Sequence, residues 1–562
     1  MVDSTHLVPW VMGAALCLGG CYSGLDVGAD ADSSGDDDPV NDPEAQCEEA
    51  NAGSLPRMVR LTHSQYDNTV RDLLGLDLDS SSVFLPDPLV GGFSNNAESL
   101  TVTDRLARDY RRAAEEIAEA LGEQPEVLSA LIPCDAGAGQ ACADQFIASF
   151  GRRAYRRPLT VDEQAAFAAI FAAGDGLYNS GSAFDQGIQL VVEAFLQSPH
   201  FLYRVELSST VDAEDPTIVP LSGYEIASRL SFLMWNSMPD DELLDAAAAG
   251  ELDTAQGVEQ AARRLLADAR ATGPVRDFHY QWLRLEEYET INKNAEVFPQ
   301  YQPGMSHVME EETLRFIERV MLEQDGTWTD LMTTPGTFVN AETAGLYGLD
   351  GSNYGEELTW VDLPATERKG ILTQSGFLAT NAYADITSPI HRGVFVQRNI
   401  LCAAIPEPPG NVDPTLPDFE GEIRTTRDAV EVHTSPVSCG GCHDSINAPG
   451  FLFEGYDAMG QVRATENGVP VDTASTVVVG AEEHQFAGAM DFIDHVAESE
   501  VARRCYLTQW FRYANMRQET FDDQCTLDGL HQVLQDTDYN LRELLVAMTQ
   551  TTTFRFRASE AG

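Results

Sequence analysis

Helix-start signals recur along this chain of 562 residues and restrict it to a mainly α-helical fold. In a capping box, a Ser or Thr and a Glu or Gln three residues later satisfy backbone N–H groups that the first helical turn leaves unpaired. Capping boxes pair Thr62 with Gln65, Thr160 with Glu163, and Ser222 with Glu225. Each box precedes apolar residues at helical spacing, so the sequence predicts several helical domains in series.

Further elements follow from the same periodicity. Additional helices are predicted at residues 104–121, 258–267, 275–285, 306–322, 492–511 and 530–548. Residues 335–380 are rich in Gly, Asn and Thr and predict turns and short elements. Residues 405–409 contain three prolines and predict an extended link, because proline cannot continue a helix. Residues 476–479 predict a short buried strand.

The most specific chemical motif is Cys439-Gly440-Gly441-Cys442-His443. Two thiols at this spacing can each add to a haem vinyl group, and the adjacent imidazole can ligate the iron. Zinc sites also use CxxC, but they need a second ligand pair, and the chain contains no second CxxC and no HxxxH. The motif therefore predicts one covalent haem c bound by Cys439, Cys442 and His443. A disulfide or redox pair at the two cysteines is the alternative.

The sixth iron ligand decides what such a haem would do. A methionine thioether opposite histidine suits electron transfer, whereas an open position suits oxygen or peroxide chemistry. Met459, sixteen residues after His443, is the first candidate, and packing in the wall of the haem crevice is the alternative role for its sulfur. The further candidates are Met490, Met516 and His484.

The amino terminus predicts export. Residues 1–21 contain an apolar stretch from Val8 to Gly20 that is too short to span a bilayer but suits a signal peptide, although no Lys or Arg precedes it. Leu18-Gly19-Gly20-Cys21 resembles the lipobox of bacterial lipoproteins, in which Cys21 would carry the lipid. Tyr22 in place of Asp favours the outer membrane by the same resemblance. A soluble secreted protein is the alternative. Residues 22–54 are rich in Asp, Gly, Ser and Pro and predict an acidic spacer.

The cysteine count agrees with an oxidising compartment. Of ten cysteines, one lies in the signal segment, one would be lipidated and two would hold haem, so six remain. The proposed pairs are Cys134 with Cys142, Cys505 with Cys525, and Cys47 with Cys402. These pairs are one of fifteen connectivities that six cysteines allow.

The charge restricts the partners. The chain has 89 acidic and 35 basic residues, a formal net charge of −54, which argues against nucleic acid or an anionic lipid surface. A redox partner with a basic surface is one expectation. The alternative is that the acidic excess serves as an adaptation to salt or only keeps the surface solvated.

Several longer motifs carry a resemblance to a known family. They are Leu61-Thr62 with Tyr66, Thr69 and Arg71-Asp72-Leu73-Leu74-Gly75; residues 150–159; Thr337-Phe338-Val339-Asn340 with Tyr347-Gly348; Gly370-Ile371-Leu372-Thr373; Thr387-Ser388-Pro389 with Arg392-Gly393; and the cysteine motif followed by Gly450-Phe451, Glu454, Tyr456-Asp457, Gly460 and Arg463. In this order they resemble a planctomycete and myxobacterial family of exported proteins built from domains of unknown function 1587, 1595, 1592, 1588 and 1585. The resemblance implies a cytochrome-c-like segment attached to helical domains.

One departure from the family pattern lies beside the haem motif. Members usually read Ile-Asp-Pro-x-Gly-Phe after the histidine, whereas this chain reads Ile446-Asn447-Ala448-Pro449-Gly450-Phe451. The proline stands one position later. The sequence therefore does not assure the hydrogen bond that a proline carbonyl gives the proximal imidazole in many c-type cytochromes.

The predicted organisation follows from these elements. It comprises a lipoprotein signal peptide at 1–21, a tether at 22–54, helical domains at 55–125, 140–207 and 218–350, a domain at 365–465 that ends in the haem segment, and a helical domain at 485–558. The expected function is electron transfer or a haem-dependent oxidoreductase activity on an unknown substrate. The alternative is a non-redox surface scaffold in which Cys439 and Cys442 form a structural disulfide. No hydrolase triad, HExxH motif or Gly-rich nucleotide loop supports another enzyme class.

Overall fold

The computed structural model describes residues 56–406, 410 and 415–559. The predicted signal segment, the lipidation candidate Cys21, the acidic tether and Cys47 lie outside the described residues. Within the described part of the chain, no helix is both long and apolar enough to cross a bilayer.

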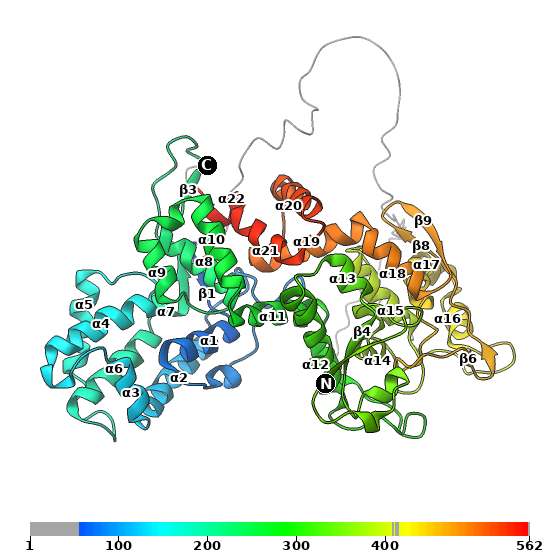
Figure 1. The fold of residues 1–562 in the computed structure, drawn as a ribbon, viewed down its shortest axis with the longest axis horizontal. Coiled ribbons are helices and arrows are strands. Elements are labelled where there is room, and N and C mark those ends of the chain that lie inside the picture. The colour runs from blue at the N-terminus through cyan, green and yellow to red at the C-terminus, as the bar shows by residue number, and fades with distance from the viewer. Residues whose placement is uncertain (1–55, 407–409, 411–414, 560–562) are drawn as a thin grey trace, which may run out of the picture. The chain divides into compact units, whose positions relative to one another are not determined.

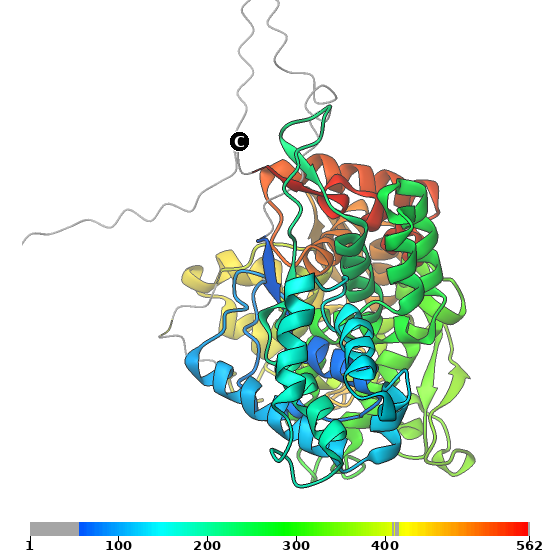
Figure 2. The ribbon, with the colours of Figure 1, turned by 90° about the vertical axis from the view of Figure 1, so that its left-hand side faces the viewer.

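The first group of helices occupies residues up to about 200 and is coloured blue to cyan in Figures 1 and 2. Its members are α1 (His63–Leu74), α2 (Asp104–Gly122), α3 (Pro125–Leu131), α4 (Gln140–Ala154), α5 (Val161–Ala172), α6 (Ala183–Leu196) and α7 (Pro199–Leu202). Helix α6 packs against both α2 and α5. Strand β1 (Met58–Arg60) pairs with β2 (Tyr203–Val205), so the two ends of this group lie side by side.

The second group contains the remaining helices. They are α8 (Gly223–Trp235), α9 (Asp241–Ala248), α10 (Ala255–Leu266), α11 (Thr272–Trp282), α12 (Met305–Glu318), α13 (Trp328–Thr333), α14 (Ser375–Thr380), α15 (Pro389–Phe395), α16 (Thr426–Thr434), α17 (Val437–Phe451), α18 (Ala489–Glu498), α19 (Glu500–Ala514), α20 (Gln524–Asp536), α21 (Leu541–Gln550) and α22 (Thr552–Arg555). Helix α21 packs on α10, so the end of the chain folds back onto the start of this group (Figure 1).

Strands contribute little. The remaining antiparallel pairs are β3 (Ile218–Pro220) with β10 (Phe556–Ala558), β4 (Gly336–Val339) with β5 (Thr359–Asp362), β6 (Thr465–Glu466) with β7 (Val469–Pro470), and β8 (Ser475–Val479) with β9 (Glu482–Phe486). The β3–β10 pair joins the first and last strands of the second group. The predicted buried strand at 476–479 is β8, and the mainly α fold is confirmed.

The two groups correspond to two large hydrophobic cores. One contains buried residues from Tyr66 to Leu202 together with Met238, and the other contains Phe93 and buried residues from Leu221 to Phe554. The helical domains predicted at 55–125, 140–207, 218–350, 365–465 and 485–558 therefore share two hydrophobic cores. Short helices bury their apolar faces against helices from the adjacent domains.

The predicted helix starts are confirmed where they can be compared. Thr62, Thr160 and Ser222 are N-caps whose capping boxes are formed, and α1 ends at Gly75 with φ of 72°. This left-handed conformation favours glycine. The predicted helix at 492–511 is interrupted at Ser499 between α18 and α19, and the one at 530–548 is interrupted at residues 537–540.

Two disulfides are described. Cys134–Cys142 has the predicted pairing. Cys402 is bonded to Cys505, so the predicted pairs Cys505–Cys525 and Cys47–Cys402 are wrong. Cys525 is also disulfide-bonded.

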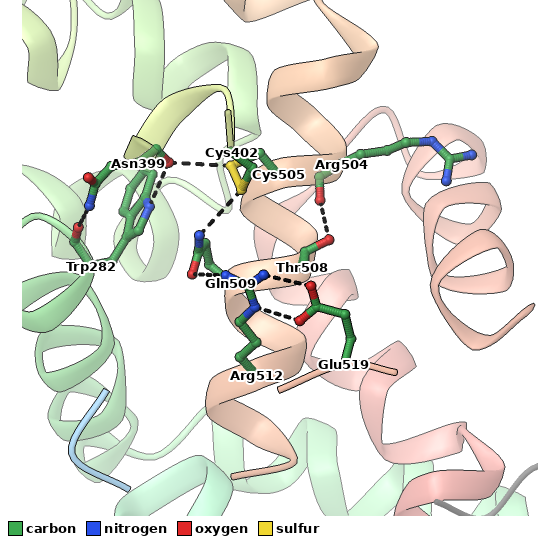
Figure 3. The surroundings of a disulfide bond; sticks show 9 residues. All are labelled: Trp282, Asn399, Cys402, Arg504, Cys505, Thr508, Gln509, Arg512 and Glu519. Atoms are coloured by element: carbon green, nitrogen blue, oxygen red, sulfur yellow. Dashed lines mark hydrogen bonds and ion pairs between the residues drawn. A yellow bond between two sulfur atoms is a disulfide. The ribbon is translucent and has the colours of Figure 1, made fainter. Parts of the chain in front are cut away.

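The reason for the observed long-range pairing is tertiary packing. Helix α19 packs against the π-helical segment η11 (Val396–Ile400), which places the Cα atoms of Cys402 and Cys505 5.4 Å apart. Figure 3 shows that Gln509 donates a hydrogen bond to the Cys402 sulfur (3.3 Å) and that the Trp282 indole donates to the Asn399 carbonyl (3.0 Å).

A buried carboxyl group lies in the second core. Glu312 of α12 is fully buried and accepts hydrogen bonds from the Thr337 hydroxyl (2.7 Å) and the Tyr347 hydroxyl. Burial raises the pKa of Glu312 from 4.5 to about 7, although Arg368 and these hydroxyls oppose the shift. The folded protein therefore holds a proton here at pH values where the unfolded chain has lost it.

The stability contributed by this proton should fall as the pH rises from about 4.5 to about 7, because the folded state binds it more tightly. Glu312→Gln resembles the protonated form at every pH. Relative to the parent, this variant should become more stable by up to about 3 kcal/mol between pH 5 and pH 8. Denaturant midpoints of both proteins across this range measure the difference. A difference that does not change with pH would contradict the assignment.

Candidate functional site

Helix α17 carries the predicted haem-binding residues. Cys439, Cys442 and His443 occupy positions i, i+3 and i+4, which lie on one face of a helix. Cys439 is half-buried, Cys442 is exposed, and the two are free thiols in this structure. The structure thus brings the three predicted residues together through helix formation alone.

The imidazole of His443 has a hydrogen-bond partner one turn further along α17. His443 Nδ1 lies 3.1 Å from Asn447 Oδ1, and the Asn447 side-chain amide donates to the Thr434 hydroxyl of α16 (2.9 Å). Asn447 and Thr434 are buried. The ring is therefore oriented by a buried polar pair that links α16 to α17.

A cavity of about 550 Å³ opens beside the motif. His443 and Asn447 line it from α17, Arg427 and Glu431 from α16, and Ser475 from β8. Its volume lies in the range of about 300–1,000 Å³ that is usual for cofactor and small-ligand sites.

Close backbone contact between α15 and α17 holds the motif helix in place. A Cβ atom on Gly393 would lie 1.8 Å from the Ile446 carbonyl oxygen, and one on Gly450 would lie 1.8 Å from the Pro389 carbonyl oxygen. Only glycine fits at these two positions without a backbone shift. Both glycines belong to the motifs that carry the family resemblance.

The shifted proline has a local consequence. Pro449 lies inside α17 and has no N–H group for the carbonyl of Ser445, four residues earlier. The side chain of Gln397, which is buried in η11, donates to that carbonyl instead (2.9 Å). Gln397 therefore links η11, which follows α15, to α17 through the carbonyl that the proline leaves without a helical partner.

A buried ion cluster lies beneath the end of α17. The Glu454 carboxylate accepts from Thr387 (2.8 Å) and Arg463 (2.9 Å) and lies 3.5 Å from Arg392. Burial raises the pKa of Glu454 and lowers that of Arg392 to about 10, which leaves Arg392 cationic at neutral pH. The Glu454 carboxylate thus connects the motif at residues 387–392 with the motif at residues 450–463.

None of the four sixth-ligand candidates lines the cavity beside His443. Met459 is fully buried in the second core and does not line the cavity beside His443. Met516 packs with Val59 and Leu100, and Met490 lies in the first turn of α18. His484 of β9 lies 4.2 Å, ring centre to ring centre, from His495. The choice of Met459 as a ligand stays a prediction.

Three residues that matter here were not singled out from the sequence. Asn447 follows His443 by four positions, so the helical i, i+4 rule could have identified it. Thr434 and Gln397 lie on other elements, and no sequence spacing connects them to the motif.

Comparison with family models accounts for most of the described chain. Residues 60–122 match a protein of unknown function (DUF1587), 142–206 match DUF1595, 221–349 match DUF1592, 368–466 match DUF1588, and 482–554 match DUF1585. The model for 368–466, which includes the cysteine motif, is named PSCyt3, and this name points to a cytochrome-like family. No curated protein and no solved structure matches the chain. The chain therefore belongs to the family of proteins built from these five domains of unknown function.

Proposed function

We propose that this chain is an exported c-type haem protein that carries one haem c on α17. The observation that supports it best is the presence of two free thiols and an imidazole on one helical face, of which the imidazole of His443 lines the cavity. A structural Zn²⁺ site would need more thiolate or imidazole ligands than these three residues supply. The donor set fits haem c.

The residues of the site divide the binding task. Cys439 and Cys442 would each form a thioether by adding a thiol across a vinyl group, and Nε2 of His443 would be the axial ligand. When bound, haem c supplies a one-electron redox couple. The protein would hold and orient the ring and limit its contact with water.

Arg427 supports this assignment from the rim of the cavity. Its guanidinium lies 4.5 Å from the centre of the Phe451 ring and donates to the Ala474 carbonyl (2.8 Å). The same guanidinium pairs with the carboxylates of Glu431 (2.8 Å) and Asp472 (3.5 Å), so a haem propionate would be a further carboxylate for its planar donors. Phe451 contributes an aromatic side chain to the same cavity.

The cellular role is proposed from the sequence. A lipid on Cys21 would anchor the protein in the cell envelope, at the outer membrane. The haem would exchange electrons with a redox partner or with an organic substrate. The net charge of −54 favours a partner with a basic surface, because complementary charge speeds association.

Covalent haem attachment tests the proposal. The full chain, produced in cells that have the haem-c maturation system, should gain the mass of one haem and keep its colour after denaturation. Cys442→Ala should reduce the covalently bound haem, and Cys439→Ala with Cys442→Ala should abolish it. Ser438→Ala, next to the motif on the same exposed turn, is the matched control and should retain haem in full.

Two outcomes would refute the proposal. Colourless protein of unmodified mass would exclude haem attachment under conditions that allow it. A mass lower by two hydrogens, with Cys439 and Cys442 joined, would favour the scaffold with a structural disulfide.

A further inference from the structure

We infer that Asn447 is a positioning residue that holds the neutral His443 imidazole in the tautomer with its hydrogen on Nδ1. This leaves the lone pair on Nε2, the nitrogen available to a metal. The tautomer is a property of the protein alone, whereas its use in iron ligation rests on the proposed function.

A chain of hydrogen bonds determines the direction of each donor. The Val430 carbonyl can only accept, so the Thr434 hydroxyl, 2.7 Å away, donates its single hydrogen to it. Towards Asn447, 2.9 Å away, the same oxygen must therefore accept. The Asn447 amide nitrogen consequently faces Thr434.

The orientation of the amide then determines the tautomer. Asn447 Oδ1 faces His443 Nδ1 at 3.1 Å and can only accept, so Nδ1 must carry a hydrogen. In a neutral imidazole the other nitrogen, Nε2, is then unprotonated. Each step follows from the number of hydrogens on one group.

Burial makes this arrangement persistent. Asn447 is 7% exposed, Thr434 is 6% exposed and Val430 is fully buried, so these three groups are largely shielded from water, whereas His443 is partly exposed beside the cavity. Loss of one link would leave a buried polar group unsatisfied. Because Thr434 belongs to α16 and His443 to α17, the packing of two helices sets the tautomer.

Asn447 therefore provides an acceptor for the imidazole without a proline carbonyl. Asn is neutral, whereas an Asp at this position would be a charged and stronger acceptor. A stronger acceptor makes the ligating imidazole more basic and stabilises oxidised iron. The amide should thus keep the reduction potential of a bound haem higher than a carboxylate would.

Nuclear magnetic resonance of the haem-free full chain tests the tautomer directly. Long-range nitrogen–proton correlations of labelled histidines should show His443 with its hydrogen on Nδ1, although free neutral histidine prefers Nε2. Thr434→Val and Asn447→Leu should each shift the population towards the Nε2 hydrogen. Ser445→Ala, an exposed site on the same helix, should leave it unchanged.

His279 provides an internal control for folding. Its Nδ1 lies 2.7 Å from the Val275 carbonyl and its Nε2 lies 3.0 Å from the Tyr506 hydroxyl, away from the substituted residues in sequence. Unchanged His279 signals in each variant would show that the core is intact. With His279 unchanged, an Nε2 hydrogen on His443 in the parent, or an Nδ1 hydrogen that persists in Asn447→Leu, would overturn the inference.

The haem-loaded protein provides a second measurement. Asn447→Asp should lower the reduction potential relative to the parent, and Ser445→Ala should not. If haem attaches but Asn447→Asp leaves the potential unchanged, the role of Asn447 in iron ligation is refuted while the proposed function stands. If no haem attaches, the proposed function fails and the tautomer measurement alone decides the inference.

Discussion

Replacing Arg392 by Met should lower the free energy of unfolding of the region around α15 and α17 by about 3–5 kcal/mol. The Arg392 side chain is fully buried and donates to the carbonyls of Phe453 (2.9 Å), Leu378 (3.2 Å) and Asp457 (2.9 Å). Removal of the guanidinium would leave these carbonyls and part of the Glu454 charge without a partner. Denaturant midpoints and hydrogen exchange of the α15 and α17 amides measure the loss.

Arg504→Met is the matched control for this prediction. Arg504 forms two ion pairs, with Glu500 (2.9 Å) and Asp528 (2.6 Å), but its side chain is 37% exposed. Ion pairs in contact with water contribute about 0–1 kcal/mol each, so the control should lose far less stability. Equal losses in the two variants would mean that the buried position of Arg392 has no special energetic role.

Removal of the Cys402–Cys505 disulfide, by changing both residues to Ala, should destabilise the second core by about 4–5 kcal/mol. The bond joins residues 103 positions apart, and a closed loop of this length restricts the unfolded chain strongly. The loop contains α17, so unfolding of the variant should also release the haem-binding helix. Denaturant midpoints under non-reducing conditions measure the change.

The Cys134–Cys142 pair offers a comparison within the same protein. This bond spans only 8 positions, and the same relation predicts a loss of about 2–3 kcal/mol when both residues become Ala. The long loop should therefore be the more costly to open. A larger loss for the short loop would show that local packing at the sulfurs, not loop length, governs these bonds.

Much of the fold could be predicted because its signals are local. Thr62, Thr160 and Ser222 each begin a helix, since a capping box needs only residues three positions apart. Helix α2 was predicted at 104–121 and extends from Asp104 to Gly122. The breaks at Ser499 and at residues 537–540 were missed, because apolar periodicity continues across them and only packing shows where a helix turns.

The candidate site likewise contains residues that local spacing predicts and residues that only packing brings in. The spacing of Cys439, Cys442 and His443 predicts one helical face wherever the segment is helical, and Asn447 falls on it by the same rule. Two further residues come from neighbouring elements. Thr434 orients the Asn447 amide, and Gln397 donates to the Ser445 carbonyl. Their roles depend on where α16 and η11 pack against α17.

The sequence by itself determined the helical class, the family motifs and the cysteine motif, because each depends on residues close together in the chain. Its choice of Cys134–Cys142, one of fifteen possible connectivities, is confirmed, whereas its other short-range pair, Cys505–Cys525, is wrong. The tertiary structure alone decided the Cys402–Cys505 bond, the Arg392–Glu454 cluster and the acceptor of the His443 imidazole. The free energy of closing a loop changes only slowly with its length, so spacing does not discriminate between distant partners. Packing does, because a buried charge or polar group is stable only where a partner lies within hydrogen-bond distance.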